Sequence, residues 1–67
     1  DMYINVIASS IATIFRMRPG YIFLNLQSVN ITKLEQAIHM LLDNDFNIQT
    51  KQRNNGLEII AVPKSAK

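Results

Sequence analysis

Leu57-Glu58-Ile59-Ile60-Ala61-Val62 is the stretch that decides the fold of this chain. In a β-strand successive side chains point to opposite faces, so the three odd-numbered residues of this stretch share one face. Ile60 and Val62 share the other face, which makes the strand apolar on both sides. A strand of this kind favours cover above and below the sheet. Because 67 residues supply material for one covering layer, the pattern predicts that a partner covers the second face.

The residues before this strand predict a β-hairpin. Asn55-Gly56 is the strongest turn signal in the chain, because a type I′ turn requires positive φ at both central residues. A two-residue turn at this position places Arg53 opposite Glu58 and Gln52 opposite Ile59. The Arg53–Glu58 pair is then a cross-strand contact between opposite charges, worth up to about 1 kcal/mol.

Two amphipathic helices are predicted from apolar spacings of three and four. The first covers residues 2–17 and ends at Pro19-Gly20. The second runs from about Thr32 to Asn44, with Thr32 and Glu35 at the spacing of a capping box. The apolar stripes are Ile4, Ile7, Ala8, Ile11, Ala12, Ile14 and Phe15 in the first helix, and Ile31, Leu34, Ala37, Ile38, Leu41 and Leu42 in the second.

Tyr21 to Gln27 alternates well enough to predict one more strand, which gives the element order α-β-α-β-β. The predicted fold is a single small α+β domain over residues 1–67. It is a two-layer α/β sandwich, in which both helices pack on one face of a three-stranded sheet that ends in the hairpin. The face under the helices is expected to carry Ile22, Leu24, Leu26, Ile48, Leu57, Ile59 and Ala61. The uncovered face is expected to carry Tyr21, Phe23, Lys51, Arg53, Ile60 and Val62.

Size and composition restrict the classes of function. A chain of about 60 residues buries only about 60% of its unfolded surface, so self-association is an ordinary way to gain stability. The net charge of +2 is too small to indicate nucleic-acid binding by itself. The absence of cysteine excludes disulfides and fits the reducing cytoplasm. The longest apolar-rich stretch, Tyr3 to Phe15, is too short and too often interrupted by polar residues to span a membrane.

No group of residues indicates catalysis. His39 is the only histidine, and it is spaced one helical turn from Glu35 and from Asp43. Without a nucleophile nearby, this row is typical of a solvated helix surface. Ser9-Ser10 has no base at helical spacing, and Asp43-Asn44-Asp45 lacks the glycine and the terminal glutamate of a calcium loop. We therefore predict that the chain is not an enzyme and has no catalytic, cofactor or metal site.

The uncovered sheet face is the predicted functional surface. Large apolar side chains on the surface of a soluble monomer favour an interface. The chain is thus interpreted as a binding or regulatory protein, a homodimer or the ligand of another protein, with interface residues Tyr21, Phe23, Ile60, Val62, Val6 and Met17. The alternative is a nucleic-acid-binding accessory protein that uses this face or the hairpin, through Tyr21, Phe23, Lys51, Arg53 and Lys64. Protein contact is favoured, because only two of the seven basic residues fall on the face.

Overall fold

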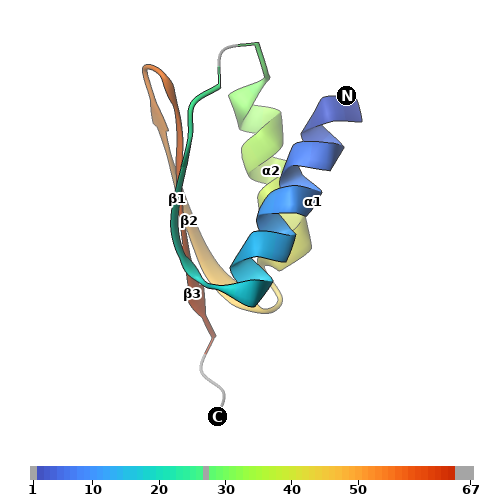
Figure 1. Ribbon diagram of the computed structural model, residues 1–67, viewed down its shortest axis with the longest axis vertical. Helices are drawn as coiled ribbons and strands as arrows, with labels where there is room; N and C mark the ends of the chain where they lie inside the picture. The colour runs from blue at the N-terminus through green and yellow to red at the C-terminus, as the bar shows by residue number, and fades with distance from the viewer. Residues whose placement is uncertain (1, 27, 65–67) are drawn as a thin grey trace.

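The computed structural model describes residues 2–26 and 28–64, in which two helices and three strands follow the predicted order α-β-α-β-β (Figure 1). The elements are α1 (Met2–Met17), β1 (Gly20–Leu24), α2 (Ile31–Leu42), β2 (Phe46–Arg53) and β3 (Gly56–Pro63). Figure 1 shows both helices on the same side of the sheet. The predicted two-layer α+β architecture is confirmed.

The sheet has the strand order β1-β3-β2, and β3 runs antiparallel to both neighbours. The stretch that is apolar on both faces therefore lies in the centre of the sheet. Leu57, Ile59 and Ala61 are buried under the helices, while Ile60 and Val62 lie on the opposite face and are exposed. Only the face toward the helices is covered.

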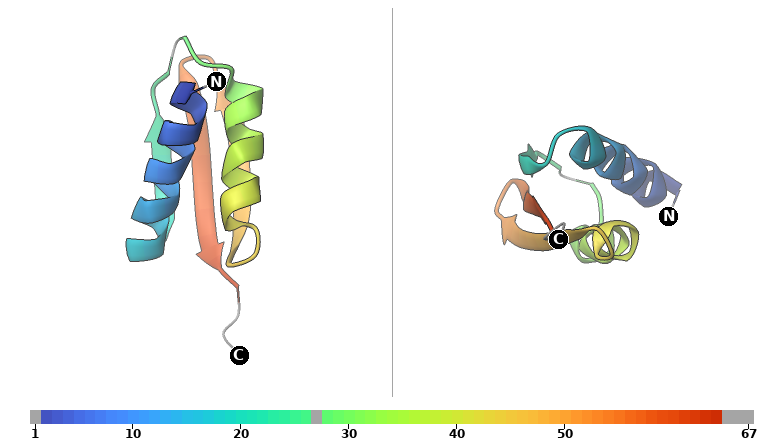
Figure 2. Two further views of the ribbon diagram at one scale, coloured as in Figure 1. Left: turned by 90° about the vertical axis from the view of Figure 1, so that its right-hand side faces the viewer. Right: turned by 90° about the horizontal axis from the view of Figure 1, so that it is seen from below.

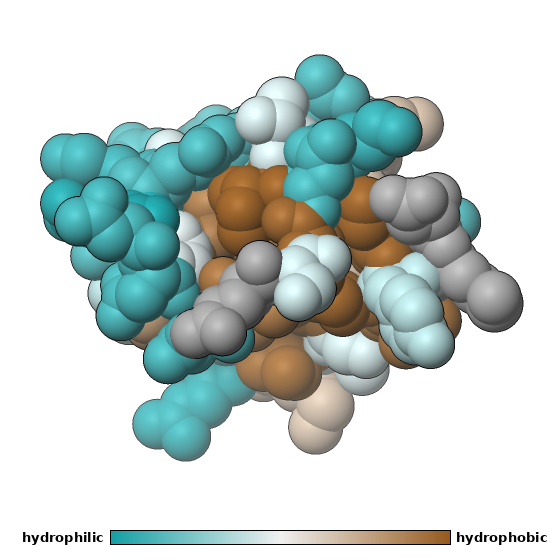
Figure 3. Space-filling view, turned by 90° about the horizontal axis from the view of Figure 1, so that it is seen from above, coloured by the Kyte–Doolittle hydropathy of each residue, from teal (hydrophilic) through white to brown (hydrophobic). Residues whose placement is uncertain are grey.

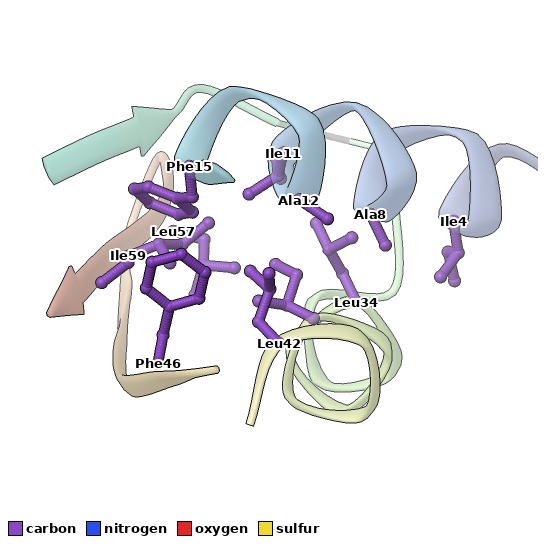
Figure 4. Packing of buried hydrophobic residues seen from close by; sticks show 12 residues of the cluster. Ile4, Ala8, Ile11, Ala12, Phe15, Leu34, Leu42, Phe46, Leu57 and Ile59 are labelled. Atoms are coloured by element: carbon purple, nitrogen blue, oxygen red, sulfur yellow. The ribbon is translucent and has the colours of Figure 1, made fainter. Parts of the chain in front are cut away.

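Helix α1 has the predicted bounds and the predicted core stripe, with one exception. The buried side chains of this helix are Ile4, Ala8, Ile11, Ala12 and Phe15. In Figure 4 Phe15 lies close to Leu57 and Ile59 of the central strand. Ile14 was expected in the same stripe, but its side chain is 50% exposed, because it lies on the flank of the helix beside that stripe.

Helix α2 begins at a different cap from the predicted one. The side chain of Asn30 accepts a hydrogen bond from the backbone N–H of Lys33 at 3.1 Å, so Asn30 is the N-cap. The predicted capping box of Thr32 and Glu35 is wrong. Both side chains instead accept hydrogen bonds at 3.2 Å from the Gln52 amide, which tie the start of α2 to the hairpin.

The C-terminal end of α2 also differs from the prediction. The helix ends at Leu42 with Asp43 as its C-cap, two residues before the predicted end at Asn44. Leu41 was placed in the apolar stripe, yet its side chain is exposed. Phe46, which the predicted core omitted, is buried at the start of β2 beside Phe15 (Figure 4).

Strand β1 is shorter than predicted and ends at Leu24. The predicted end at Gln27 lies outside the described residues. Beyond the strand, Leu26, Val29 and Ile31 are partly buried and pack against the core. Seen from above in Figure 3, apolar residues lie between hydrophilic ones at the end of the molecule that holds this connection. Partly buried apolar side chains therefore reach the surface at this end.

The hairpin register differs from the prediction by two residues. Asn54 and Asn55 form the turn, Arg53 pairs with Gly56, and Glu58 is opposite Lys51 rather than Arg53. Gly56 belongs to β3, and a Cβ on it would lie 1.8 Å from the Leu24 carbonyl oxygen. The close approach of β1, rather than a positive φ, thus explains why residue 56 is a glycine. Because side chains alternate with a period of two, a shift of two residues leaves every side chain on its predicted face.

Candidate functional site

We call the side of the sheet that faces away from the helices the free face. The strand register places two cross-strand rows of three residues and two further pairs on it. One row is Tyr21, Ile60 and Gln49, the next is Phe23, Glu58 and Lys51, and the remaining pairs are Val62 with Asn47 and Gly56 with Arg53. Neither helix covers this side in Figure 1.

The free face is divided into an apolar half and a polar half. The apolar half lies on β1 and β3, where the exposed fractions are 58% for Tyr21, 37% for Phe23, 36% for Ile60 and 51% for Val62. The polar half lies on β2, whose free-face side chains are Asn47, Gln49, Lys51 and Arg53. Four large apolar side chains thus lie together at the side of the sheet that β1 forms.

Glu58 joins the two halves through two hydrogen bonds. The Arg53 guanidinium donates to Glu58 Oε1 at 3.0 Å, and the Tyr21 hydroxyl donates to Glu58 Oε2 at 3.0 Å. The predicted ion pair between Arg53 and Glu58 is present, but it is diagonal, because Lys51 occupies the directly opposite position. Both oxygens of this carboxylate are therefore paired within the chain.

These contacts shift the pKa values of both acids. The hydrogen bond from Tyr21 lowers the pKa of Glu58, and the hydrogen bond and charge of Arg53 add to that effect. The same hydrogen bond raises the pKa of Tyr21, since loss of the phenolic proton would place two negative charges side by side. Glu58 is thus ionised and Tyr21 neutral at pH 7.

The predicted nucleic-acid contacts are not all brought together. Lys51 and the two aromatic residues lie on the free face, but the Arg53 guanidinium is already bound to Glu58. Lys64 follows the last residue of β3, while Arg53 pairs with its first. At about 3.4 Å per residue, the two cations lie at opposite ends of a strand about 27 Å long.

The predicted interface residues fall on two surfaces. Tyr21, Phe23, Ile60 and Val62 form the apolar half of the free face. Val6 and Met17 are exposed on α1, in the helix layer on the other side of the sheet. Val6 and Met17 therefore cannot contact the same partner surface as the residues of the free face. Their neighbours Tyr3 and Ile14 are also exposed, although Ile14 was predicted to be in the core.

The side chains around His39 form a surface ion pair rather than a row of three. His39 Nδ1 lies 3.0 Å from Asp43 Oδ1, whereas Glu35 Oε1 accepts a hydrogen bond from Gln52. The described residues contain no group of three or more acidic or histidine side chains placed to bind a metal ion. Within the same part of the chain, neither helix has the length and apolar character needed to cross a bilayer.

Sequence reasoning missed the position of β1 at the edge of the sheet. Strand order depends on long-range pairing, and no local pattern in residues 20–24 indicates an edge position. No family model, curated protein or solved structure matches this chain.

Proposed function

We propose that this chain is a non-enzymatic binding or regulatory module that acts through protein–protein contact, and that it forms a homodimer through the free face. The observation that carries the proposal is the apolar half of that face, where four large side chains lie exposed on two neighbouring strands. Apolar patches of this kind on a soluble protein favour a contact that removes them from water.

The charges of the free face support a contact between two copies. Glu58 is the one acidic side chain that the register places there, and its oxygens are paired with Arg53 and Tyr21. A second copy therefore meets a carboxylate that already has its partners, which reduces the cost of removing it from water. The polar side chains of β2 then lie at the rim around an apolar centre, as in many protein interfaces.

The test is the molecular mass in solution of the wild type, of Ile60→Asp and of Gln36→Asp. Ile60 lies in the centre of the free face, so a carboxylate there is expected to halve the mass of the assembly. Gln36 is exposed on α2, on the other side of the sheet, and provides a control with the same new side chain. A wild type with the mass of one chain, 7.6 kDa, would refute the proposal.

Nucleic-acid binding through the same face is the second candidate. Exposed Tyr21 and Phe23 beside Lys51 are the kind of side chains on which single-stranded RNA stacks. The ionised Glu58 in the same row as Lys51 weighs against it, because a carboxylate repels phosphate. A titration with single-stranded RNA at two salt concentrations tests this candidate, and absence of binding at low salt removes it.

The absence of cysteine supports a cytoplasmic location, which remains part of the proposal.

A further inference from the structure

Strand β1 is an edge strand without protection. It pairs only with β3, so one side of its backbone has no strand partner among the described residues. Proteins commonly protect such edges with charged residues or proline, because an open edge pairs readily with another strand. The sequence of β1, Gly-Tyr-Ile-Phe-Leu, contains neither, whereas the other edge strand, β2, carries Lys51 and Arg53.

Helix α1 lies on the β1 side of α2. In the left view of Figure 2, α1 lies in front of β1 and α2 lies in front of β2. The flank of α1 that faces α2 is known from its contacts: Arg16 donates to the carbonyl oxygen of Leu41 at 3.1 Å, and Ser9 lines a hollow together with Met40. The opposite flank of α1 therefore faces outward, on the same side of the molecule as the open edge of β1.

We call that opposite flank the outer flank. At 100° per residue it comprises Tyr3, Val6, Ile7, Ser10, Thr13, Ile14 and Met17. It carries no charged side chain, and its two ends are well exposed, 75% for Tyr3 and 81% for Met17. Exposed large apolar side chains gathered on one flank favour a contact that removes them from water.

The two aliphatic hydroxyl groups of the outer flank, those of Ser10 and Thr13, donate hydrogen bonds within α1. Ser10 Oγ donates to the Val6 carbonyl oxygen at 2.9 Å, and Thr13 Oγ1 donates to the Ser9 carbonyl oxygen at 3.0 Å. A partner that removes water from the middle of this flank thus leaves neither of these two hydroxyl protons without an acceptor.

The spacing of the outer flank is the same in both directions from Ser10. In an antiparallel pair of α1 helices related by a two-fold axis at Ser10, Tyr3 lies opposite Met17 of the second copy, and Val6 lies opposite Ile14. The small Ser10 then faces its own copy at the centre, where the two backbones approach most closely. Large side chains meet at the ends and no like charges meet anywhere along the flank.

The same two-fold axis can relate both the two α1 helices and the two β1 strands. Ser10 lies seven residues before the end of α1, which is about 10 Å along a helix. Phe23 lies three residues after the start of β1, which is also about 10 Å along a strand. Because α1 and β1 are joined by a short turn, a two-fold axis at Ser10 passes close to the middle of β1.

We propose that a second copy of the chain binds at the open edge of β1, with the two β1 strands antiparallel and the two outer flanks packed together. The two three-stranded sheets become one continuous sheet. The apolar half of each free face adjoins β1, so the two halves merge into one central patch with polar β2 strands at its rim. This inference deepens the proposed function. It rests on the proposed function because the merged patch is the surface through which the free-face contact is proposed to form.

The two contacts combine into a closed assembly. The axis of the edge contact is perpendicular to the sheet, and the axis of a contact between two free faces lies parallel to the sheet. When one merged patch meets a second merged patch on the axis of the edge contact, the two axes intersect at right angles and generate a dihedral tetramer. We therefore expect the wild type to have four times the mass of the 7.6 kDa chain.

The experiment compares Ser10→Glu, Ile60→Asp, the double variant and the control Ser9→Glu by light scattering. Ser10→Glu places two carboxylates on the two-fold axis, so it is expected to halve the mass. Ser9 is also exposed but lies on the flank toward α2, so Ser9→Glu is expected to keep the wild-type mass. The double variant is expected to have the mass of one chain, and circular dichroism verifies that each variant is folded.

Hydrogen exchange of β1 supplies a second readout. An edge strand with one partner has alternate amides unprotected, whereas a strand with two partners has all of them protected. Residues 20–24 are expected to be protected throughout in the wild type and only alternately in Ser10→Glu. Unprotected outer amides in the wild type would overturn the proposal.

The outcomes separate this inference from the proposed function. If Ile60→Asp halves the mass and Ser10→Glu leaves it unchanged, the edge contact is refuted and the free-face contact stands. If Ser10→Glu halves the mass and Ile60→Asp leaves it unchanged, the edge contact stands and the free-face homodimer is refuted. A wild type of 7.6 kDa overturns both.

Discussion

The close approach of β1 to Gly56 gives a sharp test of the hairpin register. A Cβ on Gly56 would lie 1.8 Å from the Leu24 carbonyl oxygen, 2.8 Å from the Leu24 carbonyl carbon and 3.0 Å from Phe23 Cζ. The nearest two are backbone atoms, so no change of rotamer relieves the clash. In Gly56→Ala the last residue of β1 must move away from β3, which breaks the pairing of Leu24 with Leu57.

The size of the effect follows from this geometry. Overpacking costs about 1–3 kcal/mol, and we expect a loss of about 3 kcal/mol here because the obstacle is backbone. At 0.05–0.15 kcal/mol per residue, a chain of 67 residues is stable by roughly 3–10 kcal/mol. The substitution therefore removes about a third or more of the free energy of unfolding. With an m-value of about 1 kcal/mol/M, the urea midpoint falls by about 3 M or the chain does not fold.

Urea unfolding at one fixed protein concentration measures the effect, since self-association makes stability depend on concentration. Gln36→Ala is the control on the exposed side of α2, and we expect a change within about 0.5 kcal/mol. Gly20→Ala measures backbone strain in the absence of a steric clash. A Cβ on Gly20 has no heavy atom within 4 Å, but the φ of this residue is +147°. Its expected cost is about 1–3 kcal/mol, from the backbone alone. A Gly56→Ala midpoint equal to that of Gln36→Ala would refute the close approach.

Three further predictions test the caps, the core and the free face. Asn30→Ala is expected to lower the free energy of unfolding by about 1 kcal/mol, because Asn30 caps α2. Thr32→Ala is expected to lower it by less. Equal losses for the two variants, measured by urea unfolding, would contradict the assignment of the cap. Leu34→Ala is expected to cost about 2–5 kcal/mol in the same assay, since its side chain is fully buried. Tyr21→Phe removes a donor to Glu58, so an NMR titration is expected to show a higher Glu58 pKa than in the wild type. Because that pKa is lowered by folding, Glu58 stabilises the fold above pH 4.5 and loses this effect as the pH falls through the lowered pKa.

The elements were predictable where local signals agree. Helix α1 has its predicted bounds because apolar spacing continues to Met17 and Pro19 prevents continuation. The N-cap of α2 was misassigned because Asn30 and Thr32 are two residues apart and both residue types cap helices. The hairpin register was missed for a tertiary reason, since the contact between Gly56 and Leu24 is not visible in the sequence.

The free face was predictable in membership but not in layout. Its side chains follow from alternation alone, which the shift of register by two residues preserved. Its division into an apolar and a polar half depends on the order β1-β3-β2, which no local pattern encodes. The outer flank of α1 was missed because Ile14 fits the spacing of the core stripe as well as its buried members do.

The distribution of charge along the chain connects the two proposed contacts. Nine of the twelve charged residues follow residue 32, and between residues 2 and 32 only Arg16 and Arg18 are charged. The first part of the chain builds α1 and β1, and the later part builds α2, β2 and β3. The side of the molecule formed by α1 and β1 thus has little charge, while a soluble monomer usually distributes charge over its whole surface. Such segregation is expected if the outer flank, the β1 edge and the adjoining apolar half of the free face are all removed from water in the assembly.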